Sequence, residues 1–241
     1  MEAIGEKFMN KLVEKIKQKL RRKAVAFQTG GIRPTYQMGE SWIGKVCWQK
    51  PGEEQPLSKN GYPMIPLATI FVPESDYVPK VLAGIKMINI FLDVNWLDYF
   101  DRSKLKDLFV IRTYESLDGL VPCNYLDKKQ ILPFPLVSHY VDNEFPDWSN
   151  LSLEEYDIME SAGIDMDNYD ELIYEYKDDI MHKLGGYPDP IQGDVTFDKG
   201  YEFVLQIYSD PKAGFDIIDE GNFYFGYNPD TKDWSVECDF Y

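Results

Sequence analysis

The residues best suited to chemistry gather in the C-terminal third of the chain, around the second of only two histidines. His182 carries an imidazole, which changes charge near physiological pH and can act as a general acid or base. Carboxylates that could orient it follow at Asp194, Asp210 and Asp219. This set would suit an enzyme acting on a small polar substrate. The preferred interpretation is structural, with His182 at a helix end interacting with the C-terminal carbonyl groups.

Gln206 is a second candidate, because it lies in the apolar run 204–207. An unpaired buried amide would cost about 1–3 kcal/mol, so Gln206 needs a partner in a ligand or in loop backbone. The glycines and prolines of segment 182–194 define one such loop. We predict a cleft between this loop and the Gln206 strand, although Gln206 could simply pin the loop to the sheet. The candidate ligand-binding residues are His182, Gly185, Gly186, Gln192, Asp194, Gln206, Ser209, Asp210 and Asp219.

Common catalytic and cofactor-binding templates do not fit the sequence. It contains no phosphate-binding Gly-x-x-x-x-Gly-Lys loop, no Gly-x-Gly-x-x-Gly fingerprint and no Gly-x-Ser-x-Gly elbow. Two histidines, His139 and His182, cannot make a three-histidine metal site. The acidic run 165–171 departs from the EF-hand pattern, with Tyr169 at the third ligand position. We therefore predict no catalytic residue, no cofactor and no metal, and we lean against an enzyme.

Composition describes an acidic globular protein. The 241 residues are 44% hydrophobic and carry a formal net charge of −16, which disfavours binding to nucleic acid. An acidic surface would suit a basic protein partner, as in an immunity-type protein that neutralises a toxin. Cys47, Cys123 and Cys238 form no metal-binding or disulfide pattern, and no apolar stretch is long enough to span a membrane. We expect a soluble cytoplasmic protein with reduced thiols.

The N-terminal segment 2–23 has apolar residues at every fourth position, typical of an amphipathic helix. Its other face is basic. This helix could dock on the acidic remainder of the chain, which we prefer, or make a weak contact with an anionic membrane surface.

The remaining segments predict short strands and two helices. Ser152 and Glu155 match a capping box that begins a helix ending at Ala162, and a second helix is expected over 169–181. Apolar runs predict strands, and the similarity of 67–70 to 204–207 suggests duplication. The predicted strands lie at 41–48, 67–72, 85–94, 108–114, 203–208, 222–227 and 234–240.

These elements together suggest a two-lobed single fold over residues 1–241. An N-terminal helix (1–24) would pack on a mostly antiparallel β-rich fold. A duplicated, two-lobed arrangement would place one β-rich lobe at 30–140, and helices with a second β-rich lobe at 150–241.

Several C-terminal motifs together resemble a known family. They are Lys183-Leu184-Gly185-Gly186-Tyr187-Pro188, Ile191-Gln192-Gly193-Asp194, Leu205-Gln206-Ile207-Tyr208-Ser209-Asp210 and Asp219-x-Gly221-x-x-Tyr224-Phe225. The sequence resembles the YwqG-like family of uncharacterised, mostly bacterial proteins. Lys45, Thr69 and the pair Ile217-Ile218 depart from that family's usual residues. The resemblance implies an α+β fold of unknown activity, and our leading hypothesis is a non-enzymatic binding or protein-interaction module.

Overall fold

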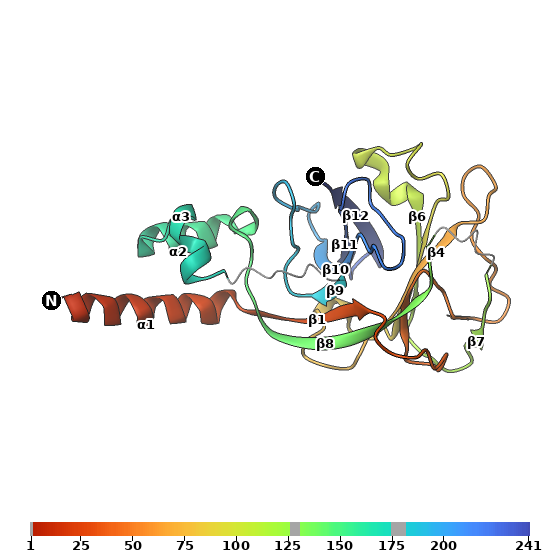
Figure 1. Cartoon of the computed structure of the whole chain (residues 1–241), viewed down its shortest axis with the longest axis horizontal. Coiled ribbons are helices and arrows are strands. Elements are labelled where there is room, and N and C mark those ends of the chain that lie inside the picture. The colour runs from red at the N-terminus through yellow and green to blue at the C-terminus, as the bar shows by residue number, and fades with distance from the viewer. Residues whose placement is uncertain (1, 126–130, 175–181) are drawn as a thin grey trace.

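One ten-stranded sheet organises the protein in the computed structural model, which describes residues 2–125, 131–174 and 182–241. Its strands lie in the order β12-β11-β10-β9-β1-β8-β2-β4-β5-β6, and all neighbours are antiparallel (Figure 1). Their bounds are β1 Arg22–Thr29, β2 Ser41–Ile43, β4 Ile65–Phe71, β5 Met87–Leu92, β6 Phe109–Tyr114, β8 Phe134–Glu144, β9 His182–Gly185, β10 Glu202–Tyr208, β11 Asn222–Asn228 and β12 Asp233–Asp239. A separate pair, β3 (Trp48–Gln49) and β7 (Val121–Pro122), forms a two-stranded sheet.

The sheet curls until its two ends meet. Phe109 on β6 packs edge-on against Phe223 and Phe225 on β11, with ring centroids 5.0 Å and 5.5 Å away. The 3-10 helix η2 (Arg102–Leu108) joins this contact through an ion pair between Lys106 and Asp233 of β12. Alternate side chains along each strand face the enclosed side, where one apolar cluster includes residues from all ten strands of this sheet. The result is a nearly closed barrel around a single core.

Three α-helices form a separate layer beside the barrel: α1 Glu2–Leu20, α2 Leu153–Ala162 and α3 Met166–Leu172 (Figure 1). Val13, Ile16 and Leu20 of α1 are buried in a cluster with Met159 of α2 and Tyr169 of α3. Two further 3-10 turns are η1 Lys80–Leu82 and η3 Trp148–Asn150. The second half of α1 therefore docks on α2 and α3.

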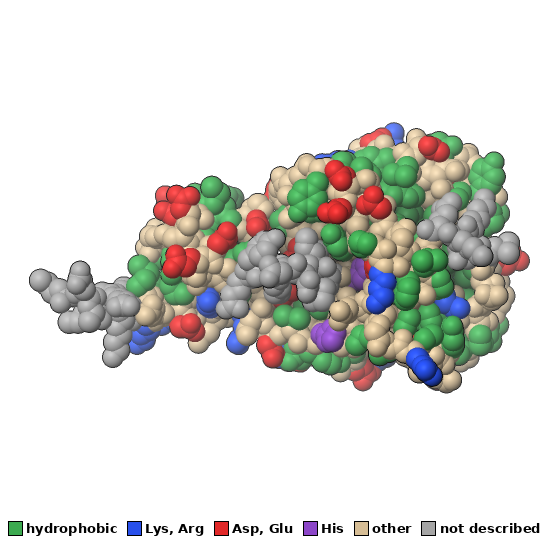
Figure 2. All heavy atoms as spheres, in the orientation of Figure 1, with side chains coloured by type: hydrophobic (Ala, Val, Ile, Leu, Met, Phe, Trp, Pro, Cys, Tyr) green, Lys and Arg blue, Asp and Glu red, His purple; other side chains and the backbone are tan. Residues whose placement is uncertain are grey.

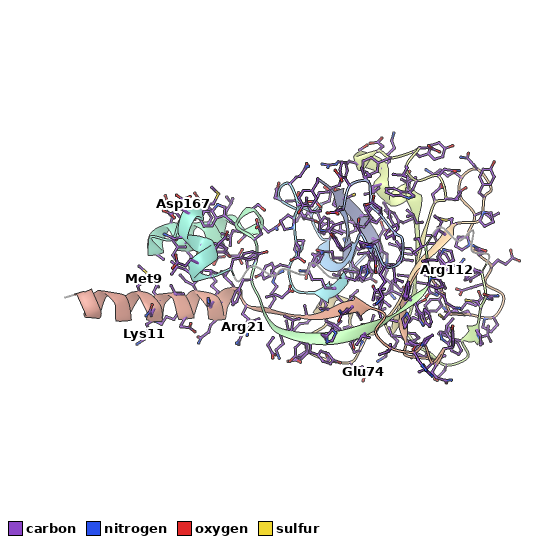
Figure 3. All side chains as sticks on the ribbon, in the orientation of Figure 1. Met9, Lys11, Arg21, Glu74, Arg112 and Asp167 are labelled. Carbon is purple, nitrogen blue, oxygen red and sulfur yellow. The ribbon has the colours of Figure 1, made fainter. Side chains whose placement is uncertain are left out.

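Charge is divided between the helices. Acidic side chains gather over α2 and α3, whereas basic ones lie along α1 (Figure 2). Met9 points to the side of α1 that faces α2 and α3, and Lys11 points the opposite way (Figure 3). Lys19 of α1 makes a 2.7 Å ion pair with Glu154 of α2. Within the described ranges, no helix combines the length and apolar character needed to cross a bilayer.

The predicted α+β class is wrong, because the protein is mostly antiparallel β with a small helical part. The two-lobed arrangement is also wrong. Strands β1 and β8 pair at the centre of the sheet and connect strands from both halves of the chain, so the halves share one sheet and one core. Neither β1 nor β8 was predicted as a strand.

The structure confirms the predicted start of α2 and corrects other predicted helix boundaries. The predicted N-terminal helix, 1–24, runs four residues past the end of α1, since α1 ends at Leu20 and β1 begins at Arg22. Ser152 and Glu155 do form a capping box at α2, and Gly163 follows its end in a left-handed conformation. The helix expected over 169–181 overlaps α3 only at residues 169–172, because α3 runs from Met166 to Leu172. Residues 175–181 of that prediction lie outside the described part of the chain.

Candidate functional site

His182 is buried at the start of β9, where it faces a carboxylate. Its Nε2 lies 3.2 Å from Oδ2 of Asp210, and its Nδ1 accepts a hydrogen bond of 3.1 Å from the Tyr208 amide. Since Nδ1 accepts a hydrogen bond, Nε2 carries the hydrogen and donates a hydrogen bond to Asp210. The expected position at a helix end is wrong. Both ring nitrogens are already engaged within the fold.

Asp210 joins three parts of the barrel. Its Oδ2 accepts a hydrogen bond from the Thr29 hydroxyl of β1, and its Oδ1 accepts one of 2.9 Å from the Ala213 amide. Burial alone would raise the pKa of Asp210, but the hydrogen bonds from His182, Thr29 and Ala213 outweigh it and lower the pKa to about 2. The carboxylate therefore stays ionised while it holds β1, β9 and the turn after β10 together.

Lys183, the next residue of β9, points to the outer side of the sheet and is also buried. Its ammonium nitrogen lies 2.7 Å from Oδ2 of Asp189 and 3.3 Å from Oε2 of Glu144. Burial by itself would lower the pKa of Lys183, but the two carboxylates more than offset this and raise it. The Tyr187 amide also donates to Oε2 of Glu144, over 3.1 Å. This Lys183 cluster attaches the loop after β9 to β8 and β9.

Gln206 of β10 is fully buried beside the Lys183 cluster. Its Oε1 accepts a 2.8 Å hydrogen bond from the Asp189 amide, and its Nε2 donates over 3.1 Å to Oδ2 of Asp189. Tyr224 of β11 lies alongside and donates from its hydroxyl over 2.6 Å to Oδ1 of Asp239. Gln206 thus pins the loop to the sheet, which was the structural alternative drawn from the sequence.

The other candidate residues fall in different places. Gly185 and Gly186 both have positive φ, +83° and +70°, and a Cβ at Gly186 would collide with the Glu144 carboxylate. Ser209 is buried and accepts from the Ile217 amide over 2.8 Å. Asp219 lies exposed in the turn before β11. Gly185, Gly186 and Ser209 therefore maintain the local backbone conformation, whereas Asp219 faces solvent.

Gln192 and Asp194 do border a pocket, of about 260 Å³. It lies over β11 and β12, and Arg102, Tyr224, Glu237 and Asp239 also contribute to its walls. His182, Gln206 and Asp210 do not line it. The nine candidate residues are therefore divided among the His182 pair, the strand and loop around the Lys183 cluster, this polar pocket and the segment between β10 and β11, and their role in ligand binding stays a prediction.

A larger cavity of about 590 Å³ was not predicted from the sequence. It lies against β1, β8 and the start of β2, and it is bordered by the ends of β4 and β6 and the residue before β5. Its lining residues are Val25, Phe27, Gly39, Ser41, Phe71, Val72, Pro73, Glu74, Lys86, Glu115, Ser116, Leu117, Asp118, Leu136, Ser138 and Tyr140. Alternation of Leu136, Ser138 and Tyr140 on one face of β8 is the signal that could have found it.

The cavity has an apolar base and a charged mouth. Val25, Phe27 and Leu136 are buried in its wall, whereas Ser138 and Asp118 are exposed, so it opens to solvent. Lys86 pairs with Glu74, and Lys232 lies 2.8 Å from Glu115. Glu74 projects beside β8 in Figure 3. The lining thus has three carboxylates and one ammonium group, a negative excess at the mouth.

Among residues 2–125, 131–174 and 182–241, no group of three or more His, Cys, Asp or Glu residues could hold a metal ion.

A comparison with protein families gives one match. A family model described as a domain of unknown function, DUF1963, covers residues 47–231. The chain belongs to this family. Comparison with curated proteins finds no match. The DUF1963 match includes the His182 pair, the Lys183 cluster and cavity residues from β4 to β8, whereas Val25 and Phe27 of the cavity wall precede it.

Proposed function

We propose that this DUF1963 protein is a binding protein that takes a small, largely apolar molecule with a cationic end into the cavity of about 590 Å³. The size of that cavity is the observation that carries the proposal, since small-molecule sites in proteins span about 300–1,000 Å³. An apolar wall with few polar groups at its edge is also typical of such sites.

The charge at the mouth selects the kind of ligand. Glu74 and Glu115 are each paired with a lysine, and Asp118 adds a third carboxylate at the exposed edge. An ammonium group on the ligand would meet this negative excess while its apolar part covers Val25 and Phe27. A carboxylate or phosphate group there would be repelled.

The geometry of His182 favours binding over catalysis. A general base needs a free lone pair, and Nδ1 of His182 already accepts from the Tyr208 amide. Its Nε2 faces Asp210, and neither residue lines the cavity. The enzymatic alternative would require this buried network to open before His182 could accept a proton.

Substitution on β8 tests the cavity directly. Ser138→Trp would fill it from an exposed position, and His139→Trp is the matched control because adjacent strand residues point to opposite faces. Binding of alkyl and aryl amines, with matched alcohols and carboxylates, would be measured by calorimetry and thermal shift. We expect amines to bind the wild type and the His139→Trp variant, and to bind the Ser138→Trp variant about tenfold or more weakly.

Asp118→Asn tests the charge preference separately. Because Asp118 is exposed, its loss should weaken amine binding only about two- to fivefold and leave alcohols unaffected. Amines that bind equally well to the wild type and Ser138→Trp would refute the cavity as the site. Carboxylates that bind better than amines would refute the charge assignment.

Two broader expectations remain part of this proposal. The specific YwqG-like resemblance is supported by the motifs around Gly185 and Gln206, within the DUF1963 match. A cytoplasmic location is supported by Cys47, Cys123 and Cys238 being free thiols in the structure. A basic protein partner for the acidic surface is a further expectation, which a pull-down with purified basic proteins would test.

A further inference from the structure

Cys47 immediately precedes β3 and Cys123 immediately follows β7, and the two cysteines lie opposite each other. The ladder pairs Trp48 with Pro122, so the next step of the antiparallel register places Cys47 opposite Cys123. The Cys123 amide donates a 2.9 Å hydrogen bond to the Cys47 carbonyl oxygen, which supports this pairing. Two cysteines far apart in the sequence are thus brought together by the fold.

The geometry of the ladder suits a disulfide. Directly opposite residues on antiparallel strands project to one face with Cα atoms about 4.5–5.5 Å apart, within the span of about 4.4–6.8 Å that disulfides bridge. Gln49 follows Cys47 on that face of β3, and it accepts a hydrogen bond from the Tyr125 hydroxyl beyond Cys123. Side chains from the two segments therefore already meet across this face.

The two thiols differ in accessibility. Cys123 is half-buried and its Sγ lies 3.3 Å from the Val46 carbonyl oxygen, whereas Cys47 is buried. Burial raises the pKa of Cys47 to about 12 and that of Cys123 to about 11. Little thiolate is present at neutral pH, so oxidation would be slow. Cys238, the third cysteine, lies buried on β12 opposite Phe223.

We propose that Cys47 and Cys123 form a reversible disulfide when a small-molecule disulfide, such as oxidised glutathione, oxidises the protein. The Cys123 thiolate attacks one sulfur of the oxidant, whose S–S bond breaks and releases one thiolate. The Cys47 thiol loses its proton to solvent and attacks Sγ of Cys123, which releases the second thiolate. The two protein thiols are oxidised to one disulfide, and the oxidant is reduced to two thiols.

This disulfide would fix the short β3–β7 ladder covalently. β7 follows residues 115–118, which border the cavity, so oxidation would restrain that side of its mouth. The inference rests on the register of β3 and β7 and does not depend on ligand binding.

The experiment treats the folded, full-length protein with oxidised glutathione at mildly alkaline pH. Thiol titration after denaturation should fall from three thiols to one. Peptide mapping without reductant should find Cys47 linked to Cys123. The melting temperature should rise by at least about 4 °C, and dithiothreitol should reverse the rise.

Single variants separate the disulfide from other oxidation. Cys238→Ser should keep the link, and Cys47→Ala should abolish both the link and the rise in melting temperature. Cys123→Ser, at the half-exposed position, gives the same test if Cys47→Ala fails to fold. Three thiols remaining after prolonged oxidation, or glutathione bound at Cys123 without a Cys47 link, would overturn the proposal.

Discussion

Replacing Lys183 with methionine should strongly destabilise the barrel. Methionine keeps much of the apolar length of lysine but removes the ammonium group that lies 2.7 Å from Asp189 and 3.3 Å from Glu144. Lys183 and Glu144 are both buried, with 3% and 4% of their surface exposed, so Glu144 would remain as a buried charge without this cation. Breaking a buried ion pair from one side typically costs about 3–5 kcal/mol.

The loss of the ammonium group should cost more at Glu144, which is buried, than at Asp189, which is partly exposed. The Asp189 side chain is 26% exposed, so water can replace part of its lost interaction. Glu144 keeps the hydrogen bond from the Tyr187 amide, but its ionised form loses a neighbouring positive charge. We therefore expect Lys183→Met to lower the free energy of unfolding by about 3–4 kcal/mol.

Urea denaturation followed by tryptophan fluorescence would measure the loss. Adding Glu144→Gln to Lys183→Met removes the buried negative charge while leaving an oxygen for the Tyr187 amide. The double variant should therefore recover at least about 1 kcal/mol relative to Lys183→Met. A single-variant loss below about 1 kcal/mol, or no recovery in the double variant, would refute this account of the Lys183 cluster.

Two further predictions follow from the same part of the fold. Because the folded pKa of Asp210 is lowered from 3.8 to about 2, its contribution of about 2 kcal/mol is present above about pH 4 and is lost as pH falls through 2. Asp210→Asn should reduce the pH dependence of the free energy of unfolding in that window, which urea titrations at several pH values would measure. An unchanged pH dependence would contradict the role given to Asp210. In the same denaturation assay, Gly186→Ala should lower the free energy of unfolding by at least about 2 kcal/mol more than Gly163→Ala does. Both glycines have positive φ, but only Gly186 lies against Glu144, so equal losses would contradict the predicted clash.

Strands that are apolar and bounded by turns could be predicted from sequence alone. β4, β5 and β6, and later β10, β11 and β12, are short runs rich in β-branched and aromatic residues, which is why their positions were found. The α2 capping box was found for a different reason, because Ser152 and Glu155 bond locally and need no tertiary partner.

The central pair of strands could not be recognised in the same way. β1 follows α1 with only Arg21 between them, so the predicted helix included the first residues of β1. Much of the second half of β8 is exposed, and its sequence there lacks an apolar run. Without this pair, the sequence offers two separate groups of strands, which is why a two-lobed arrangement was predicted.

The candidate site was predictable only as far as local chemistry allows. Gln206 was identified because a buried amide needs partners, and a partner was found in Asp189. The protonated nitrogen of His182 depends on the Tyr208 amide, a contact that only the pairing of β9 with β10 creates. The large cavity depends on the curl of the whole sheet, which no single segment encodes.

The meeting of η2 with β12 has a consequence for how the protein behaves at high concentration. The terminal strands of an open sheet expose unpaired amide and carbonyl groups, which can recruit strands from other molecules. Here β6 and β12 are turned toward each other, with the Lys106–Asp233 and Lys232–Glu115 ion pairs across the seam. The same curl that encloses the core therefore shields the chain from edge-to-edge aggregation.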